Sequence, residues 1–365
     1  MATLDMPSTP LPGAAPVWLD IALTARCPLR CRFCTVEKRP GAELTAAQWC
    51  EVMTAVAALR PVRLVSLEGG EPLLRPDLAE IARAGLACAD EVKIVTGGSI
   101  PFDVLPSELT RSPRLTLEVS VDGPQPIHDE LRDGSWEAAW AFIGAARTRG
   151  VHLRLRSVLS VVNLHVFEEW LAAVDRRLEE HGAPVGFRFD TLIAPHTLQA
   201  MGGPLQRHPL RVYDSRGLLP SPAEVVGLYR RLGRCGFRRL RLEQTEPFRG
   251  CGAGRTPLIS FDPAGRFSFC CEAPRSFGSA LELGAGQIIR LLDSQMAALP
   301  CRRCAHLDQN RCDGCWTGRK CGMTTAWGLP DCRALIDAGG GLRAQARRGR
   351  ARGRRPDGAA APSSL

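Results

Sequence analysis

The chain has 365 residues, of which 45% are hydrophobic and 23% charged, and its formal net charge is +9. This length exceeds one typical domain and can bury a large core, whereas no apolar run approaches the roughly 18 residues of a membrane span. Because the N-terminus also lacks the basic, apolar and small-residue segments of a signal peptide, we expect a cytoplasmic protein without a membrane partner.

The first predicted strand is Val17–Thr24, an alternating run that leads into a loop with three cysteines. Cys27, Cys31 and Cys34 have the spacing C-x3-C-x2-C, and the aromatic Phe33 precedes the last thiol. A [4Fe–4S] cluster is usually held by four thiolates, so a loop with three of them leaves one iron open for chemistry. A structural zinc site is the alternative interpretation, but zinc motifs usually add a second ligand pair, and none follows nearby.

Helical and strand patterns then alternate along the chain. A helix is predicted to begin near Thr45, because Gln48 completes a capping box and apolar residues recur with helical spacing up to Val56. Further strands are predicted at 63–68, 91–96, 114–121, 151–162 and 186–193, and further helices at 76–84, 136–149, 166–180 and 221–234. Six strands connected by helices indicate an α/β fold with a parallel sheet.

The cysteine loop resembles the signature of the radical S-adenosylmethionine (SAM) enzymes, and the similarity extends over residues 17 to about 335. In that family SAM chelates the open iron, and the reduced cluster cleaves it to methionine and a 5′-deoxyadenosyl radical that abstracts a substrate hydrogen. The resemblance implies a partial (β/α)6 TIM-type barrel over residues 17–246. It also implies that Cys27, Cys31 and Cys34 are catalytic ligands, with Phe33 in the cofactor-binding loop.

A second segment resembles another motif of this family. Gly69, Gly70, Glu71 and Pro72 follow the second strand, where the backbone of relatives meets the SAM amino group. Paired glycines suit this role, since they let the main chain approach a ligand closely. Taken alone, the same four residues could form an ordinary turn.

Two later strands carry further candidate SAM contacts. Ser120 and Asp122 end the fourth strand and resemble family residues that lie near the SAM ribose and carboxylate. Arg156 on the fifth strand is a candidate partner of the SAM carboxylate. A strand-ending Asp-Gly turn and a solvent-facing arginine are the alternatives, because period two places Arg154 and Arg156 on the same face. Residues 194–220 lack a sustained period and are predicted to be an insertion over the barrel mouth, or else a plain connector.

A second group of cysteines follows the barrel. Cys251, Gly265 and Cys270 match the C-x(9–15)-G-x4-C opening of the SPASM extension, a module with auxiliary [4Fe–4S] clusters, and 261–269 between them is predicted to be a β-hairpin. Six more cysteines lie downstream: Cys301, Cys304, Cys312, Cys315, Cys321 and Cys332. We therefore expect residues 247–335 to be a small Cys-rich SPASM-like domain with one or two auxiliary clusters. Zinc knuckles are the competing interpretation.

The family's ligand spacing fits these cysteines in two imperfect registers. In the preferred register the outer cluster is held by Cys301, Cys304, Cys312 and Cys332, and the inner cluster by Cys251, Cys270 and Cys315. The second register uses Cys312, Cys315 and Cys321, and it leaves Cys301 and Cys304 without a role. Cys271 or Cys321 is a candidate fourth ligand of the inner cluster, unless that iron is open to substrate.

Cys271 is also a candidate catalytic residue. In sulfatase-maturing relatives an aspartate that is thought to act as a base follows the cysteine matched by Cys270, so Cys271 argues against sulfatase maturation. Its thiol could instead donate a hydrogen atom or a proton, bind a cluster or simply pack. The sequence leaves these roles open.

The C-terminal end concentrates the positive charge. Seven arginines lie between residues 343 and 355, without apolar periodicity, so we expect 336–365 to be a disordered basic tail and 1–16 a disordered leader. The tail could contact RNA or an acidic partner, but the balanced charge elsewhere disfavours nucleic-acid binding as the main function.

Together these features predict a radical SAM oxidoreductase acting on a peptide or protein side chain, as in the maturation of ribosomally made peptides. The resemblance also implies flavodoxin or ferredoxin as the reductant. Two alternatives remain: a radical SAM dehydrogenase of a small molecule such as a sugar alcohol, and a non-enzymatic metal-binding adaptor.

Overall fold

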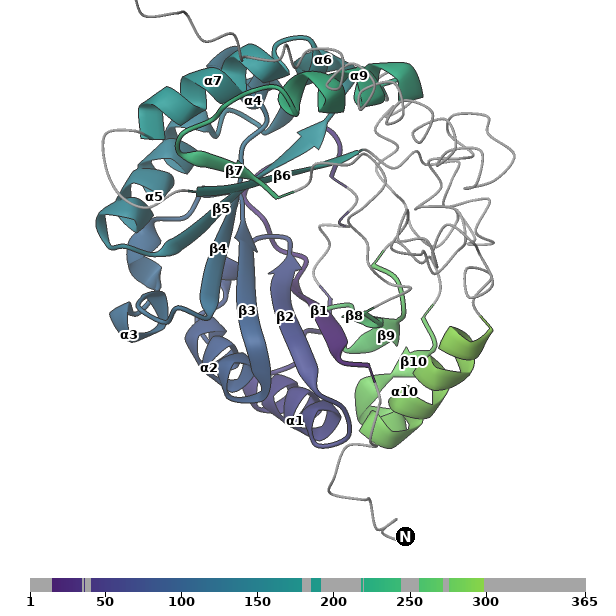
Figure 1. Ribbon diagram of the computed structural model, residues 1–365. Coiled ribbons are helices and arrows are strands. Elements are labelled where there is room, and N and C mark those ends of the chain that lie inside the picture. The colour runs from purple at the N-terminus through teal and green to yellow at the C-terminus, as the bar shows by residue number, and fades with distance from the viewer. Residues whose placement is uncertain are drawn as a thin grey trace, which may run out of the picture.

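The structure is a computed structural model that describes residues 15–34, 36, 41–178, 185–191, 218, 220–243, 256–271 and 276–298. Its centre is a run of six parallel strands, β1 (Val17–Thr24), β2 (Val62–Gly69), β3 (Ala89–Thr96), β4 (Leu115–Ser120), β5 (His152–Leu159) and β6 (Val185–Thr191). Each strand pairs in parallel with the next one along the chain. The predicted α/β fold with six parallel strands is therefore confirmed, and Figure 1 shows these strands curving like the wall of an open barrel.

Helices cover the outside of this curved sheet (Figure 1). The five predicted helices are present as α1 (Ala46–Ala57), α2 (Leu78–Cys88), α5 (Trp136–Thr148), α7 (Phe167–Leu178) and α9 (Pro222–Leu232). The expected capping box of α1 is confirmed: the Gln48 N–H donates to Thr45 Oγ1 over 3.3 Å, and the Thr45 N–H donates to Gln48 Oε1 over 2.9 Å. No helix among the described residues is both long enough and apolar enough to cross a membrane.

Short elements connect the larger ones. They are η1 (Pro72–Leu74), η2 (Phe102–Val104), α3 (Ser107–Thr110), α4 (Gln125–Leu131) and α6 (Val161–Leu164). The prediction that the fifth strand reaches residue 162 is wrong, since β5 ends at Leu159 and α6 begins two residues later. Ser160 and Asn163 form a capping box, so their side chains satisfy the helix N-terminus and end the strand.

Four further strands extend the sheet beyond the six central ones. They are β7 (Leu240–Leu242), β8 (Leu258–Phe261), β9 (Arg266–Ser268) and β10 (Gly278–Ser279), and the strand order is β10-β9-β8-β1-β2-β3-β4-β5-β6-β7. The predicted hairpin over 261–269 is confirmed as β8 and β9, which pair antiparallel. Because β8 also pairs in parallel with β1, the hairpin continues the barrel sheet at its open edge.

The hairpin turn lies against the segment that follows the cysteine loop. The Leu44 N–H donates to the Pro263 carbonyl over 2.8 Å. Gly265 has a φ of +74°, a backbone conformation that favours glycine, and a Cβ there would lie 2.6 Å from Leu44 Cδ1. The helix α10 (Ala280–Ala297) follows and lies beside α1, and Arg60 at the end of the α1 segment forms a 2.7 Å ion pair with Asp293 of α10.

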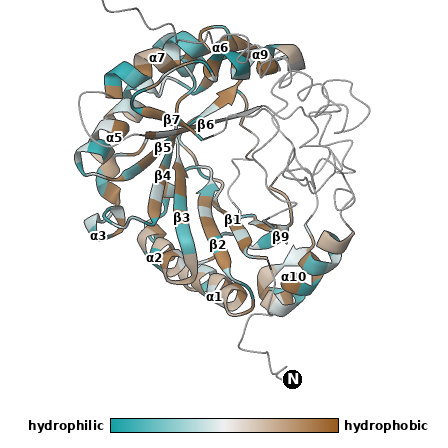
Figure 2. Ribbon diagram, viewed as in Figure 1, coloured by the Kyte–Doolittle hydropathy of each residue, from teal (hydrophilic) through white to brown (hydrophobic). Residues whose placement is uncertain are grey.

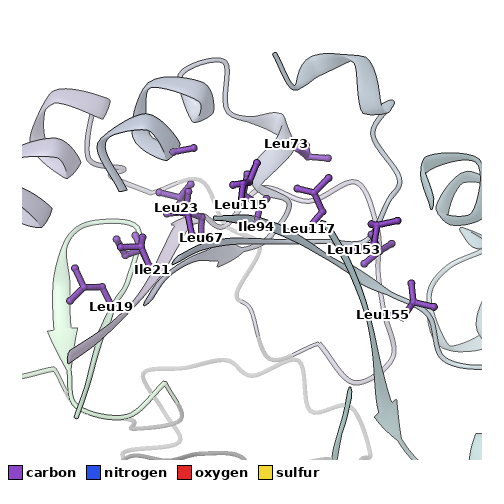
Figure 3. Close-up of a cluster of buried hydrophobic side chains, with 14 of the residues drawn as sticks. Leu19, Ile21, Leu23, Leu67, Leu73, Ile94, Leu115, Leu117, Leu153 and Leu155 are labelled. Atoms are coloured by element: carbon purple, nitrogen blue, oxygen red, sulfur yellow. The ribbon is translucent and has the colours of Figure 1, made fainter. Parts of the chain in front are cut away.

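The hydrophobic core lies between the sheet and its helices. Figure 3 shows the side chains of Leu19, Ile21 and Leu23 on β1 and of Leu115 and Leu117 on β4 projecting from the same face of the sheet. Because side chains alternate along a strand, the other face receives the residues between them. Figure 2 accordingly shows hydrophobic and hydrophilic residues alternating along the central strands. The barrel therefore has an apolar outer layer and a polar interior.

Candidate active site

The cysteine loop leaves the sheet at the C-terminal end of β1, which is the edge that carries the active site in parallel α/β barrels. Cys31 is buried, and Cys27 and Cys34 are half-buried. Thr24 starts the loop: its Oγ1 accepts a 3.0 Å hydrogen bond from the Arg26 N–H and donates to Glu43 over 2.5 Å. The loop is thus ordered from its first residue.

The Gly-Gly-Glu-Pro segment packs directly on the cysteine loop. The Gly70 N–H donates to the Thr24 carbonyl over 2.7 Å, and the Glu71 N–H donates to the Arg26 carbonyl over 2.8 Å. A Cβ on Gly70 would lie 2.2 Å from the Arg26 oxygen, and one on Gly69 would lie 2.5 Å from the Thr24 oxygen. Both glycines are therefore required by contact between two backbone segments, and their contact with SAM stays a prediction.

The Glu71 side chain joins the loops that follow β2 and β3. Its carboxylate accepts 2.9 Å hydrogen bonds from Thr96 Oγ1 and from the Gly97 N–H, and a 3.2 Å bond from the Leu73 N–H at the start of η1. Burial raises the pKa of Glu71 above its usual range, and these hydrogen bonds act in the opposite direction. Glu71 therefore organises the motif through its side chain, and Pro72 follows as the first residue of η1.

Asp122 is a fully buried hub at the end of β4. Its Oδ1 accepts from the Val158 N–H over 2.7 Å and from Ser157 Oγ over 3.1 Å, while its Oδ2 accepts from Arg132 Nε over 2.5 Å. Its carbonyl accepts from the Asn163 side chain over 2.9 Å. The carboxylate thus ties β4 to β5 and to the turn after α4. Asp122 therefore has a structural role, and its contact with SAM stays a prediction.

Ser120 and Arg156 lie side by side, because they are register partners on β4 and β5. Both point into the barrel by the alternation of their strands, and Arg156 also pairs in register with Arg188 of β6. The structure therefore brings two of the predicted SAM contacts together at the C-terminal edge of the sheet. Asp122 lies two residues beyond Ser120, within the hub just described.

His128 of α4 is a neutral, buried part of the same hub. Burial lowers its pKa to about 4. Its Nδ1 accepts from the Asp122 N–H over 3.3 Å, so the ring proton lies on Nε2, which is 3.1 Å from Ser135 Oγ. We assign this tautomer from the hydrogen-bond pattern.

The barrel interior holds a cluster of charges around Glu118 of β4. Four cations surround this fully buried carboxylate at 3.4 to 4.0 Å, namely Lys93, Arg154, Arg156 and Arg188. Burial by itself would raise the pKa of Glu118, but attraction to the four cations outweighs it and leaves the pKa below its usual value. The sequence pattern predicted the shared face of Arg154 and Arg156, but it did not identify Lys93, Glu118 and Arg188 as members of the cluster. The available signal was a charged residue between apolar neighbours in each strand pattern.

On the opposite wall of the interior, Asp20 of β1 carries a second buried carboxyl group. Ser260 of β8 donates to it over 3.3 Å. Burial, followed by the charge of Glu68 on β2, raises the pKa of Asp20 well above its usual range. The interior therefore presents carboxyl groups at β1 and β2 and a cationic cluster at β3 to β6.

Of the cysteines predicted to bind auxiliary clusters, the structure describes Cys270 and Cys271. Cys270 is buried and Cys271 is exposed just after β9, and Ser268 Oγ donates to the Cys270 carbonyl over 2.7 Å. The other seven cysteines predicted as ligands in this region lie outside the described residues: Cys251, Cys301, Cys304, Cys312, Cys315, Cys321 and Cys332. So do the predicted leader up to residue 14, nearly all of the insertion at 194–220 and the whole basic tail.

The donor set on the N-terminal loop fits a [4Fe–4S] cluster. Among the described residues, no three His, Cys, Asp or Glu side chains are grouped to hold a single metal ion. A cluster differs in that each thiolate binds its own iron, so its ligands surround the cube instead of meeting at one ion. Three thiols within eight positions of one loop, with no fourth cysteine beside them in the sequence, match that requirement.

Residues 21–176 match the family model described as the radical SAM superfamily. The chain is therefore similar to the radical SAM superfamily over about two-fifths of its length. The match implies SAM and a [4Fe–4S] cluster, the cofactors of that superfamily. It also shows that the cysteine loop and the strands up to β5 belong to the matched region.

Curated relatives match about two-fifths of this chain. The pre-heme d1 synthase of Dinoroseobacter shibae is 33% identical over 42% of this chain and 39% of its own length. The GTP 3′,8-cyclase of Rhodopseudomonas palustris is 30% identical over 43% of this chain and 48% of its own. The chain thus spans less than half the length of these relatives.

Solved structures resemble more of the chain. A structure of anSMEcpe with AdoMet (SAM) and the Cp18Cys peptide bound has a TM-score of 0.61 at 13% identity, covering 91% of this chain and 99% of that one. Streptococcus suis SuiB has a TM-score of 0.52 at 16% identity, covering 74% and 64%. At such low identity these likenesses show that the α/β fold is shared.

Proposed function

We propose that this chain is a radical SAM/SPASM oxidoreductase that modifies a peptide or protein side chain. The observation that carries the proposal is the cysteine loop, which the backbone of the Gly-Gly-Glu-Pro segment holds at the C-terminal edge of an open barrel. Support for a peptide substrate comes from anSMEcpe, a structure of the same fold that holds both AdoMet and a peptide.

The chain's residues would have the following roles. Cys27, Cys31 and Cys34 would hold the cluster, which together with SAM supplies a 5′-deoxyadenosyl radical. Ser120 and Arg156 are neighbours on the inner face of the same edge, where hydroxyl and guanidinium groups can bind the ribose and the carboxylate of SAM.

The barrel interior would receive the substrate. Its charged groups are held in fixed positions, since Glu118 anchors the cations of β3 to β6. On the β1 side, Asp20 has a raised pKa and is therefore the carboxyl group best suited to carry a proton. Such an interior can orient a polar substrate beneath the radical source.

The cysteines after the barrel would hold auxiliary clusters. In the preferred register Cys251, Cys270 and Cys315 bind the inner cluster, and the outer cluster is held by Cys301, Cys304, Cys312 and Cys332. Cys271 lies exposed beside the buried Cys270, where it can act as a further ligand or as a donor to the substrate. A flavodoxin or ferredoxin would deliver the electron that starts each cycle.

Anaerobic reconstitution and SAM cleavage test the proposal. With one cluster on the loop and two beyond the barrel, each of four irons, we expect about twelve irons per chain. The variant with Cys27, Cys31 and Cys34 changed to Ala should retain about eight irons and form no 5′-deoxyadenosine. Cleavage of SAM by this variant would contradict the catalytic assignment, and about four irons in the wild type would remove the auxiliary clusters. A wild type without SAM cleavage would favour the metal-binding adaptor.

A small-molecule substrate is the second candidate, because the curated relatives are named for heme synthesis and GTP cyclisation. Incubating the reduced enzyme with SAM and either a candidate precursor peptide or a sugar alcohol distinguishes the two. Deuterium transfer from labelled peptide to 5′-deoxyadenosine supports the peptide, and transfer from the labelled alcohol supports the alternative.

A further inference from the structure

The last residue of α4 and the turn that follows it contact the cysteine loop on both sides of its central thiol. The Arg30 N–H donates to Asp133 Oδ2 over 3.0 Å, and the Arg32 N–H donates to the Leu131 carbonyl over 2.9 Å. Cys31 lies between these two anchored residues. Both donors are backbone N–H groups of the loop, so the two bonds fix the path of its main chain through the central cysteine.

Asp133 has an unusual backbone conformation for a residue with a side chain. Its φ is +58°, and within the described part of the chain it is the one residue other than glycine with a positive φ. Aspartate tolerates this region better than most residues, but glycine occupies it without steric cost. The turn alone would therefore favour glycine, whereas the bond to the Arg30 N–H requires a side-chain acceptor.

Arg132 contacts the cysteine loop through the ring of Phe33. Its guanidinium lies 5.0 Å from the centroid of the Phe33 ring, and its Nε donates to Asp122 over 2.5 Å. The side chain is almost fully buried. Asp122 is in turn held by the Val158 N–H of β5. A continuous set of contacts therefore joins the sheet, through Asp122 and Arg132, to the aromatic ring beside Cys34.

We propose that Leu131–Asp133 forms a latch that holds the cysteine loop in its cluster-binding conformation, with Asp133 as the positioning residue. The latch rests on the proposed function, since it presupposes that the loop binds a cluster. Residues 131–133 belong to none of the motifs singled out in the sequence, and they lie about a hundred positions from the loop that they hold.

The test compares Asp133→Gly with Asp133→Asn in the reconstituted full chain. Glycine keeps the φ of +58° without strain but removes the acceptor, whereas asparagine tolerates this φ and keeps an oxygen that can accept from Arg30. Glu130→Gln is the matched control, because it removes only the exposed ion pair between Glu130 and Arg32. Thermal unfolding of each variant reports whether the fold is intact.

The measurement is the rate at which a ferrous chelator removes the SAM-sensitive cluster. The amount of this cluster that remains is monitored through the change that SAM causes in the EPR spectrum of the reduced protein. We expect Asp133→Gly to lose that cluster about tenfold faster at an unchanged or higher melting temperature, since the acceptor for the Arg30 N–H is gone. Asp133→Asn and Glu130→Gln should match the wild type.

Wild-type retention by Asp133→Gly would overturn the latch, and so would equally rapid loss from Asp133→Asn. In both cases a SAM-sensitive spectrum in the wild type leaves the proposed function standing. A wild-type chain without any SAM-sensitive cluster would overturn the proposed function and the latch with it.

Discussion

At the scale of single residues, motif positions predicted to contact SAM also hold the protein together. Glu71 and Asp122 each use their carboxylate oxygens on hydrogen-bond donors of this chain. Gly69 and Gly70 are needed for contact with the cysteine loop itself. A substitution in these motifs therefore changes the site by displacing a neighbouring segment as well as by removing a ligand contact.

Gly70→Ala tests this reasoning. The added Cβ would meet the backbone oxygen of Arg26 at 2.2 Å, and no side-chain rotation relieves a contact between backbone segments. We expect a loss of about 1–3 kcal/mol in the free energy of unfolding, and loss of the SAM-induced spectral change. Gly144→Ala is the control, because Gly144 lies inside α5 with nothing within 4 Å of its Cβ, and there alanine should stabilise by about 0.5–1 kcal/mol. Equal effects of the two substitutions would contradict the close packing of the loops.

His128 gives a prediction on pH. Its folded pKa of about 4 lies below the ordinary 6.5, so the unfolded chain binds more protons between these values and stability rises with pH there. The stabilisation is complete above pH 6.5 and is lost as the pH falls, by about 2 kcal/mol between pH 7 and pH 5. Urea unfolding at several pH values should show this slope in the wild type and a shallower one in His128→Asn. His165 is exposed, so the control variant His165→Asn should keep the wild-type dependence of stability on pH. An unchanged dependence in His128→Asn would show that other groups cause it.

At the scale of helices and strands, local sequence signals identified the elements with strong patterns. Elements without such patterns were missed. The seven residues of α4 include a proline near its start, and α10 contains Gly284 with a φ of 71° and a ψ of 160°, which interrupts the helical spacing. The short strand β7 has three residues and is defined by its pairing with β6. Such elements form because the sheet and its neighbours provide contacts, which a local pattern does not record.

The capping box of α1 is a local signal with a measurable contribution. Thr45→Ala removes the acceptor for the Gln48 N–H and should lower the free energy of unfolding by about 1 kcal/mol. Thr45→Ser keeps the hydroxyl and should cost much less. Denaturant unfolding of both variants measures the difference, and equal losses would show that the threonine methyl group, and not the cap, is responsible.

At the scale of the whole molecule, the barrel encloses charges that no single segment could hold. Glu118 forms ion pairs with cations from three other strands, and it is fully buried. Removing one partner of a buried charge network leaves the others uncompensated, which costs more than the pair contributes.

We therefore expect Glu118→Gln to lower the free energy of unfolding by about 3–5 kcal/mol. The folded pKa of Glu118 lies below its ordinary value, so its contribution is present above pH 4.5 and is lost as the pH falls further. Glu108→Gln removes an exposed carboxylate paired with Arg83 and should change stability by less than about 0.5 kcal/mol. Denaturant unfolding at pH 7 measures both, and a near-neutral Glu118→Gln would show that the cations are compensated by other groups.

The sequence by itself determined the parallel α/β fold, six strand positions, the capped start of α1 and the β8–β9 hairpin. These features follow from patterns within a few residues, such as alternation, helical spacing and turn glycines. The family model matches the region that contains the cysteine loop, and the roles of its three thiols stay a prediction. The loop could be identified in this way because its three ligands lie within eight positions of one another.

The tertiary structure alone decided what surrounds that loop. Asp133 meets Arg30 across 103 positions, and Glu118 meets cations from β3, β5 and β6. The tertiary structure also brings the paired glycines into contact with the cysteine loop and places Arg132 within hydrogen-bond distance of Asp122. These contacts depend on strand order, register and the curvature of the sheet, and a one-residue change in register would send each side chain to the opposite face.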